Sequence, residues 1–298
     1  MSPRSLCLPR LLGRLCQLSR LGPRNLPTKL HLPSLLGLAL SASAVLAACQ
    51  RPPRADRRPL EVKPGQLKVL TFNVNYGGVD PSRSAEAILA SGADLVALQE
   101  TNPAWETVLT SRLKGRYPHQ RYFHAPAAGG LAFLSRWPLG PTNLSPPPSG
   151  GWFAAWHAEV QTPLGRVHLL NVHLRPPIGE SGATSSMPSA YLSTRPIRAS
   201  EMAHHMAGLP ARGPVLVLGD FNEGDQGRAV TLLRKRGFAS ALGSKDPATA
   251  TWQWQTSLGP IRTRLDHILF RGLRLKGAQV LPEAASDHFP VEAVFTSL

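Results

Sequence analysis

The chain has 298 residues, of which 42% are hydrophobic and 17% charged, as in a folded globular protein and unlike a disordered one. Lys and Arg number 33 against 18 Asp and Glu, giving a formal net charge of +15 that favours a phosphate-bearing partner or an anionic surface over a cationic one. No apolar run reaches the roughly 18 residues of a confident membrane span.

The first 48 residues predict an export signal. Residues 1–31 contain six basic residues and no acidic one, and residues 32–48 are apolar, uncharged and rich in small side chains. A basic region followed by an apolar one is typical of a secretory signal peptide. The Leu-Ala-Ala-Cys ending at 46–49 resembles a bacterial lipobox, which implies cleavage before Cys49, a lipid on Cys49 and a membrane-anchored lipoprotein of the cell envelope. An ordinary signal peptide is the alternative.

Residues 49–65 predict a tether between this anchor and the domain. Residues 50–61 hold four arginines and three prolines without hydrophobic periodicity. One catalytic domain is expected at 66–298, and residues 62–298 keep a net charge of +7. We expect a monomer.

From residue 67 onward, strand and helix patterns alternate. Apolar runs predict strands at 67–74, 94–98, 130–135, 152–161, 166–174, 215–219, 265–270, 273–281 and 291–296. Helices are expected at 84–90, 103–113, 196–206 and 227–236, and loops at 140–151 and 175–194. Strands that arrive singly, in pairs and between helices predict a mixed α/β domain with more than one sheet.

Polar side chains follow or begin six of the apolar segments, at positions that a core does not favour. They are Asn73, Glu100, His173, Asp220 with Asn222, Asp266, and Asp287 with His288. A carboxylate at the end of a buried strand is costly unless it is paired, hydrogen-bonded or bound to a metal. Oxygen ligands suit Mg²⁺ or Mn²⁺. No cysteine or His-x-x-x-His cluster in the sequence indicates zinc.

Six segments, in order, resemble the signature series of the endonuclease/exonuclease/phosphatase superfamily. They are Thr-Phe-Asn at 71–73, Leu-Gln-Glu-Thr at 98–101, Asn-Val-His-Leu at 171–174, Gly-Asp-Phe-Asn at 219–222, Arg-Leu-Asp-His at 264–267 and Ser-Asp-His-Phe-Pro at 286–290. The resemblance covers essentially the whole predicted domain. It implies the four-layer α/β sandwich of deoxyribonuclease I, with two packed mixed sheets, helices outside and a site at one end.

The resemblance also implies metal-dependent hydrolysis of a phosphate ester by an activated water. Glu100 would hold Mg²⁺ or Mn²⁺, with Asn73 and Asp287 in or near its shell. The metal would polarise the phosphoryl group and stabilise the leaving oxygen. Asn75 stands where some members carry a supporting acid.

The remaining residues of the series would act on the water and the phosphate. Asp220 would deprotonate the water, and Asn222 would hold the water or a phosphate oxygen. His288 would bind a non-bridging oxygen, with its tautomer fixed by Asp266. His173 would hydrogen-bond the phosphate or the leaving oxygen. In members that pair this histidine with a carboxylate, the resemblance implies a general-acid role for it.

Two departures from the family pattern affect this interpretation. The stretch 129–137 contains no acid to pair with His173, so a general-acid role for that residue stays open. The segment 175–198 carries Arg175, Tyr191, Arg195 and Arg198 among glycines, serines and prolines. These four residues predict a lip, meaning a loop at the edge of the site, that recognises the substrate group beside the scissile phosphate. The alternative is a surface insertion with solvated arginines.

Three functions compete. An exported nuclease acting on DNA or RNA fits the basic domain. The alternative is a phospholipase-C/sphingomyelinase-like or inositol-phosphate-type phosphoesterase, for which Trp252 and Trp254 are candidate membrane contacts although the sequence shows no clear hydrophobic hairpin. A non-catalytic binding protein would be expected to lack Glu100, Asp220 or His288, and all three are present.

Overall fold

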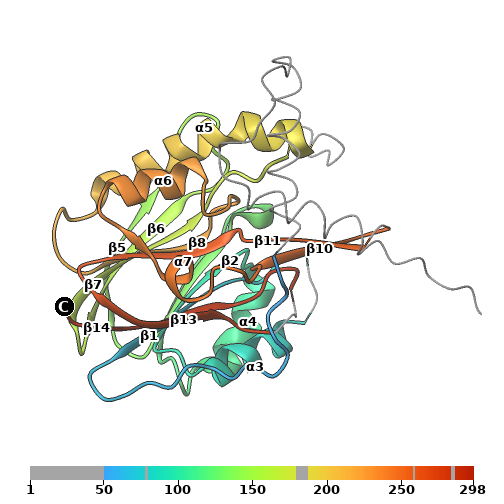
Figure 1. Ribbon diagram of the computed structural model, residues 1–298. Helices are drawn as coiled ribbons and strands as arrows, with labels where there is room; N and C mark the ends of the chain where they lie inside the picture. The colour runs from blue at the N-terminus through green and yellow to red at the C-terminus, as the bar shows by residue number, and fades with distance from the viewer. Residues whose placement is uncertain (1–49, 78–79, 179–186, 258, 283–285) are drawn as a thin grey trace, which may run out of the picture. The chain divides into compact units, whose positions relative to one another are not determined.

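The computed structural model describes residues 50–77, 80–178, 187–257, 259–282 and 286–298; the predicted signal segment and Cys49 lie outside these ranges. The described residues form two six-stranded mixed sheets and a separate two-stranded hairpin, with helices flanking the sheets (Figure 1). The predicted α/β sandwich is therefore confirmed. Within the described ranges, no helix has the length and apolar character needed to cross a membrane.

The first sheet has the strand order β13-β14-β1-β2-β4-β3. Its members are β1 (Leu67–Asn73), β2 (Leu95–Gln99), β3 (His119–Phe123), β4 (Leu131–Ser135), β13 (Arg274–Val280) and β14 (Val291–Thr296). Only the β1–β2 pair is parallel among the described pairs of this sheet. Two helices, α3 (Pro81–Ser91) and α4 (Pro103–Leu113), pack on its outer face. Each begins with a proline after a capping side chain, Asp80 or Asn102, which accepts from the first free N–H groups.

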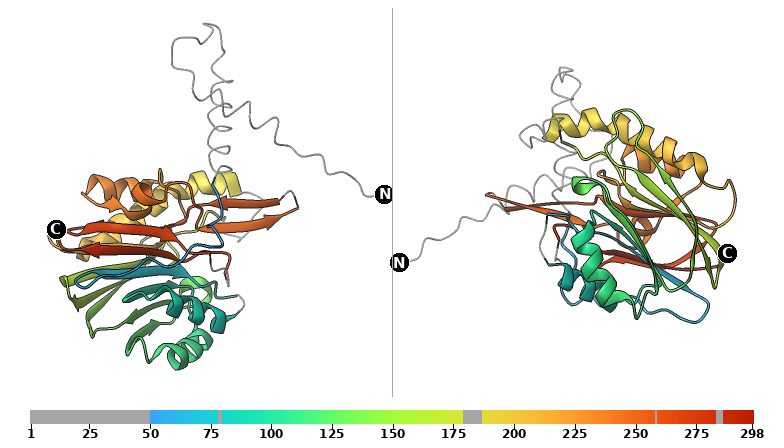
Figure 2. Two further views of the ribbon diagram at one scale, coloured as in Figure 1. Left: turned by 60° about the horizontal axis from the view of Figure 1, so that its bottom comes forward. Right: turned by 180° about the vertical axis from the view of Figure 1, so that it is seen from behind.

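The second sheet has the strand order β5-β6-β7-β8-β12-β9. Its members are β5 (Leu139–Ser145), β6 (Ala155–Thr162), β7 (Gly165–His173), β8 (Val215–Asp220), β9 (Ala239–Ser240) and β12 (Asp266–Arg271). β7 and β8 are parallel. The outer face is covered by α5 (Met187–His205) and α6 (Arg228–Lys235), which lie on the opposite side of the domain from α3 and α4 (Figure 2). Short helices η1 (Ala127–Gly129), η2 (Met206–Gly208) and α7 (Ala241–Lys245) complete the connections.

An apolar core fills the space between the sheets, and one polar bridge crosses it. Val69, Phe133 and Leu169 belong to this core. Below the site, Gln99 Nε2 donates to Asn171 Oδ1 at 2.7 Å, and Asn171 Nδ2 donates to two carbonyls of the first sheet. Because a buried amide is costly without partners, this network fixes how the two sheets align where the catalytic strands end.

Five of the described strands fall where the sequence gave no strand prediction, among them the two-residue β9. β5 occupies part of the predicted loop 140–151, β3 was not anticipated, and β10 (Trp252–Thr256) with β11 (Gly259–Thr263) forms an antiparallel hairpin. β3 and β5 are edge strands with half-exposed, polar sequences, which blurs the apolar alternation of a strand. The hairpin projects from the sheets (Figure 1).

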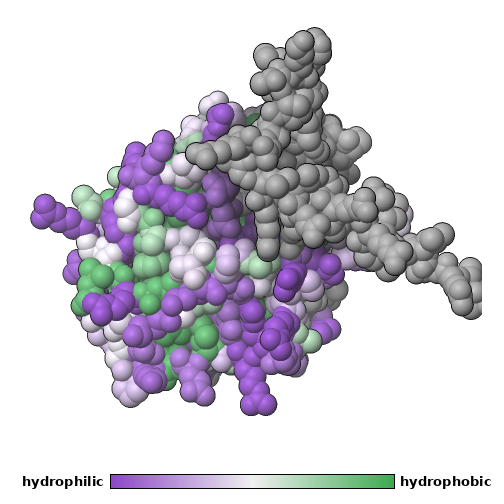
Figure 3. Space-filling model, in the orientation of Figure 1, coloured by the Kyte–Doolittle hydropathy of each residue, from purple (hydrophilic) through white to green (hydrophobic). Residues whose placement is uncertain are grey.

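The described part of the predicted tether is not a free linker. Arg51 pairs through its backbone with Ala248 and Ala250, and the Arg57 guanidinium bonds Asp246. Leu60 N–H donates to Glu292 at 2.6 Å. Residues 51–60 therefore contact the domain through the Arg57 guanidinium and through the backbone of Arg51 and Leu60. Polar and charged side chains cover most of the described surface in the view of Figure 3.

Candidate active site

The predicted site residues meet at one end of the sandwich. Asn73 ends β1 and pairs in register with Gln99, the residue before Glu100. In the other sheet, His173 ends β7 directly beside Asp220, the last residue of β8, and Asp266 begins β12 opposite Asp220. Since parallel strands present their carboxyl ends at the same edge, the fold collects side chains from both sheets around one point.

Asn73 links the carboxylates of the two sheets. Its Nδ2 donates to Glu100 Oε1 at 2.9 Å and to Asp220 Oδ2 at 3.1 Å. Its Oδ1 accepts from the backbone N–H of Asn75 at 3.0 Å. The Asn73 side chain thus lies next to Glu100. Its amide nitrogen donates to the two carboxylates, and its amide oxygen accepts from the Asn75 backbone.

Glu100 is held in a strained and largely desolvated position. Its φ of 65° lies in the left-handed region, as do those of Asn75 at 59° and Asn222 at 50°. Such conformations cost about 1–3 kcal/mol each for ordinary residues and cluster at functional sites. Burial raises the pKa of the Glu100 carboxyl, against hydrogen bonds from Asn73 and from the Tyr76 N–H. A cation beside this carboxylate would compensate the desolvation.

Asp287 stands beside Glu100 with both oxygens oriented. Oδ1 accepts from Asn75 Nδ2 and Oδ2 accepts from Trp252 Nε1, each at 2.9 Å. Asn75 therefore supports the site through its amide. The donor set of Glu100 and Asp287 consists of carboxylate oxygens, which fits a hard divalent cation such as Mg²⁺ or Mn²⁺.

His288 is a buried, charged imidazole. Its Nδ1 lies 2.9 Å from Asp266 Oδ2, and its Nε2 lies 3.7 Å from Asp220 Oδ2. Burial alone would lower the pKa of His288, but the charges of Asp266 and Asp220 outweigh it and raise that pKa to about 10. A protonated ring has no free lone pair, so the close grouping of Asp220, Asp266 and His288 acts as a charged hydrogen-bonding unit and not as a metal cage.

Asp220 is the buried acid at the centre of the site. Its Oδ1 accepts from the N–H of Asn222 at 2.8 Å, and Asn222 Nδ2 donates to the Leu174 carbonyl at 2.9 Å. Burial raises the pKa of Asp220 to about 6, opposed by the positive charge of His288. An acid with a pKa near neutrality is suited to take a proton from water.

His173 lies on the other side of Asp220 and is oriented without a carboxylate. Its Nδ1 lies 3.1 Å from the carbonyl oxygen of Ala128, which only accepts, so the proton of the neutral ring sits on Nδ1. Nε2 faces Asp220 at 3.6 Å and Glu100 at 3.8 Å. The Phe153 ring stacks on the imidazole with a centroid distance of 4.2 Å. Burial lowers the pKa of His173, which disfavours the charged form that a general acid requires.

Two of the four predicted lip residues are interior residues. Arg198 is fully buried; it contacts Glu223 at 3.3 Å and donates to the carbonyls of Arg175 and Tyr191. Arg175 is 2% exposed, with its guanidinium over the Trp152 ring and Nη1 bonded to the Gly150 carbonyl. In place of the predicted contact with substrate, both brace the loop beside His173. The sequence did not predict this burial, because arginines in a polar segment are usually exposed to solvent.

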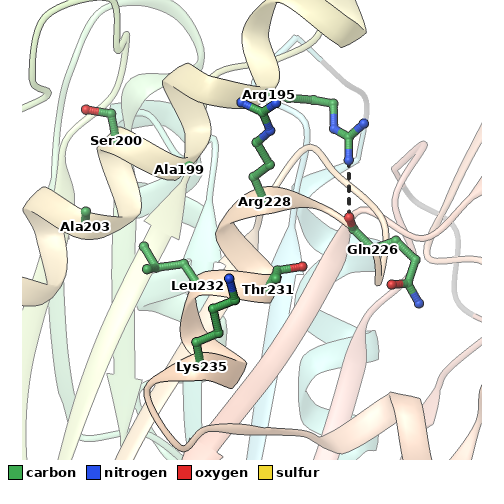
Figure 4. A pocket seen from close by; sticks show the side chains of 9 residues that line it. All are labelled: Arg195, Ala199, Ser200, Ala203, Gln226, Arg228, Thr231, Leu232 and Lys235. Atoms are coloured by element: carbon green, nitrogen blue, oxygen red, sulfur yellow. Dashed lines mark hydrogen bonds between the residues drawn. The ribbon is translucent and has the colours of Figure 1, made fainter.

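The other two lip residues are more accessible. Tyr191 is partly buried, and its ring lies below the Arg198 guanidinium at 5.1 Å. Arg195 lines a hollow of about 540 Å³ between α5 and α6, together with Arg228 and Lys235 (Figure 4). Its Nη2 donates to the Gln226 carbonyl at 3.4 Å. Arg195 is thus the one predicted lip arginine that joins a basic surface.

Ala128, Phe153 and Trp252 position the site, and the sequence did not assign them these roles. Ala128 acts through its backbone and Phe153 through ring stacking, so neither carries a chemical signature. Gly130 is an indirect sequence signal of this region. A Cβ at this position would lie 1.8 Å from the Thr101 carbonyl, so only glycine lets the start of β4 pass the turn after Glu100.

Comparison with known proteins agrees with this geometry. The sequence matches the Endonuclease/Exonuclease/phosphatase family over residues 70–288, and the chain belongs to that family. Members of the family hydrolyse phosphate esters with the help of divalent metal ions. UPF0294 protein YE0917 of Yersinia enterocolitica is 38% identical over 84 residues, which make up 28% of this chain and 30% of that protein. The match thus spans less than a third of that curated relative.

Solved structures share the fold at low identity. An endonuclease/exonuclease/phosphatase from Beutenbergia cavernae is 20% identical with a TM-score of 0.63, covering 78% of this chain and 72% of that one. Sphingomyelinase C from Streptomyces griseocarneus is 20% identical, TM-score 0.54, covering 78% and 99%. D. rerio TDP2 complexed with single strand DNA product is 17% identical, TM-score 0.56, covering 78% and 99%. The named substrates of these neighbours differ, so the shared fold leaves the substrate to be argued from this site.

Proposed function

We propose that this protein is a divalent-metal-dependent phosphodiesterase that cleaves nucleic acid. One observation carries the chemistry: the buried Asp220 carboxylate and the charged His288 ring face one another at 3.7 Å, with Glu100 joined to Asp220 through Asn73. A base, a cationic phosphate ligand and a metal-binding carboxylate are the parts that in-line attack of water on a phosphodiester needs.

The residues divide the work as follows. Asp220 accepts the proton of the attacking water, held in place by the Asn222 N–H. His288, kept charged by Asp266, donates from Nε2 to a non-bridging oxygen. His173 Nε2, which carries no proton in the neutral ring, accepts a hydrogen bond from the attacking water or from a hydroxyl of the substrate. Glu100 and Asp287 would hold Mg²⁺ or Mn²⁺, which when bound neutralises charge on the phosphoryl group and on the leaving oxygen.

The basic hollow supports nucleic acid as substrate. Arg195, Arg228 and Lys235 line it, and no acidic residue is among its lining residues (Figure 4). A strand that extends from the scissile phosphate across α5 and α6 would find cationic partners for its backbone. A small phosphate ester would gain nothing from this surface.

The direct test uses the full-length chain, purified in mild detergent, and supercoiled plasmid. We expect nicking with Mg²⁺ or Mn²⁺, none with EDTA, and a loss of at least about 1,000-fold in Asp220→Asn. Asp56→Asn is the matched control, because Asp56 is exposed and pairs only locally with Arg54. Nicking that survives EDTA or Asp220→Asn in a folded protein would contradict the proposal.

A second substrate class is favoured by the hairpin. Trp254 and Ile261 lie opposite each other on β10 and β11 and are 51% and 54% exposed. Trp252, at the base of the hairpin, bonds the site residue Asp287. An exposed indole with an aliphatic neighbour suits a bilayer interface. The alternative function is therefore a phospholipase-C/sphingomyelinase-like phosphoesterase acting on lipid headgroups.

Vesicles separate the two substrates. A lipid enzyme would release headgroups from sphingomyelin or phospholipid vesicles, lose this in Trp254→Ala/Ile261→Ala, and leave plasmid intact. A nuclease would show the reverse, with the double variant still nicking plasmid. Cleavage of a soluble phosphodiester by both proteins would verify that the variant is folded.

We also propose that the protein is exported and anchored in a membrane through a lipid on Cys49. The support is the lipobox-like ending at 46–49. Since residues 51–60 pack on the domain, an anchor at Cys49 would hold the domain close to the membrane surface. Cys49→Ser should move the protein from the membrane fraction to the soluble fraction; an unchanged distribution would contradict the lipid anchor.

A further inference from the structure

Two histidines and a glutamate gather on β6 and β7, away from the active site. Glu159 pairs directly with His168 in the ladder, and His157 lies two residues from Glu159 on the same strand. Their neighbours Trp156, Ala158, Val160 and Val167 point into the core between the sheets. By strand alternation, the three polar side chains share the outer face of the second sheet.

This cluster is separate from the catalytic centre. His168 precedes His173 by five residues on β7, which places the two Cα atoms roughly 17 Å apart along the strand. The odd spacing also turns their side chains to opposite faces of the sheet. A group bound at His168 would therefore not touch the active site.

The ligand atoms are already close to one another. His157 Nε2 lies 3.0 Å from His168 Nδ1, and His168 Nδ1 lies 3.8 Å from Glu159 Oε1. All three lie within 4.8 Å of one another. Ligands at about 2.1 Å from a tetrahedral Zn²⁺ are about 3.4 Å apart. The two measured separations lie on either side of this value, so small side-chain rotations would place an ion between them.

The surroundings fit a metal site with one open position. Burial lowers the pKa of both histidines, so their rings are neutral and their lone pairs available at neutral pH. Side-chain exposures of 14% for His168 and 26% for Glu159 leave room for a solvent ligand. Arg166 approaches the other oxygen of Glu159, Oε2, at 3.8 Å, so it supports the carboxylate without occupying the ligating oxygen.

We propose that His157, Glu159 and His168 bind a divalent transition-metal ion, with Zn²⁺ the best match, through two imidazole nitrogens, one carboxylate oxygen and solvent. Nitrogen ligands select Zn²⁺ over the Mg²⁺ that oxygen ligands favour. The protein then holds two metals of different kinds: a hard cation at the catalytic carboxylates and Zn²⁺ across the β6–β7 ladder. The zinc site ties two strands together and rests on none of the catalytic residues.

The test is metal binding to the full-length chain, purified in mild detergent, stripped with a chelator and kept in excess Mg²⁺. Isothermal titration with Zn²⁺ should show one equivalent that His168→Ala lacks and that Glu159→Gln binds at least about 10-fold more weakly. Bound Zn²⁺ should raise the thermal midpoint by about 5 °C. His124→Ala is the matched control, because His124 pairs with Glu106 at 2.6 Å and joins no three-ligand group among the residues that the structure describes.

Co²⁺ as a substitute ion distinguishes these ligands from cysteine. Visible d–d bands that disappear in His157→Ala and in His168→Ala would support the site. Equal zinc stoichiometry and affinity in the wild type, Glu159→Gln and His168→Ala would overturn it. So would thiolate-to-cobalt bands that vanish when the cysteines are alkylated and persist in both histidine variants. Retained circular dichroism in each variant ensures that loss of binding is not loss of folding.

Discussion

His288 Nδ1 and Asp266 Oδ2 are 2.9 Å apart, and Asp266 faces Asp220 across the β8–β12 ladder. The imidazole is thereby held between two buried carboxylates. Its pKa of about 10 means that the folded protein retains a proton which the unfolded chain releases near pH 6.5. The protonated His288 therefore stabilises the folded state, and this stabilisation is complete below pH 6.5 and is lost as the pH rises through about 10.

Asp266→Asn should lower the pKa of His288 by at least about 2, because it removes the nearest negative charge. The imidazole resonances of His288, followed by NMR from pH 5 to pH 10 with EDTA present, measure this directly. The variant should also lose hydrolytic activity while retaining its fold. An unchanged titration would show that Asp266 does not hold the charge on His288.

Glu201 should make stability depend on pH through a different route. It is fully buried, and its Oε2 accepts from the Arg175 N–H. Burial raises the pKa of Glu201 to about 7. Folding therefore favours the protonated carboxyl of Glu201. The contribution of this proton to the stability of the folded state is complete below pH 4.5 and is lost as the pH rises through 7.

Glu201→Gln mimics the protonated acid and should be more stable than the wild type at pH 8. The difference between the two proteins should grow by about 3 kcal/mol from pH 4 to pH 8. Urea unfolding of both proteins at several pH values isolates this group, because all other titrations cancel. Parallel stability curves would contradict the raised pKa.

The buried hydrogen bond between Gln99 and Asn171 should contribute measurably to the free energy of unfolding. Asn171→Leu leaves the Gln99 amide without its 2.7 Å acceptor and should cost about 2–3 kcal/mol of unfolding free energy. Gln99→Leu/Asn171→Leu should cost less than the sum of the single variants, since neither amide is then left unpaired. Gln161→Leu, on the exposed side of β6, is the control. If the loss of unfolding free energy in the double variant equalled the sum of the losses in the two single variants, the coupling would be excluded.

Gly219 should be required for the placement of Asp220. A Cβ on Gly219 would lie 2.0 Å from the Val172 carbonyl, and its φ of 142° is one that side chains rarely adopt. Gly219→Ala should therefore destabilise the domain by about 3 kcal/mol or more and reduce hydrolysis further than stability alone explains. Thermal unfolding and activity below the midpoint measure both effects. Gly115→Ala, with nothing within 4 Å of its Cβ, should be nearly neutral.

The local patterns of the sequence predicted a mixed α/β domain with more than one sheet and placed the polar residues at the strand ends, because an apolar run predicts a strand and a carboxylate directly after it needs a partner. The sandwich itself was implied by the resemblance of six short segments to the family. Asn73, Glu100, His173, Asp220, Asp266, Asp287 and His288 do converge in the structure. Their order along the chain also matches the family, which is why the expected fold agrees with the observed one.

Only the tertiary structure decided which atoms meet. The Ala128 carbonyl orients His173 in place of a carboxylate, and Arg198 points into the interior, toward Glu223. His157 and His168 are far apart for a zinc motif, and strand pairing makes them neighbours. Local sequence patterns carry the burial preference of each segment, whereas contacts between distant segments depend on register and packing, which no short stretch of sequence contains.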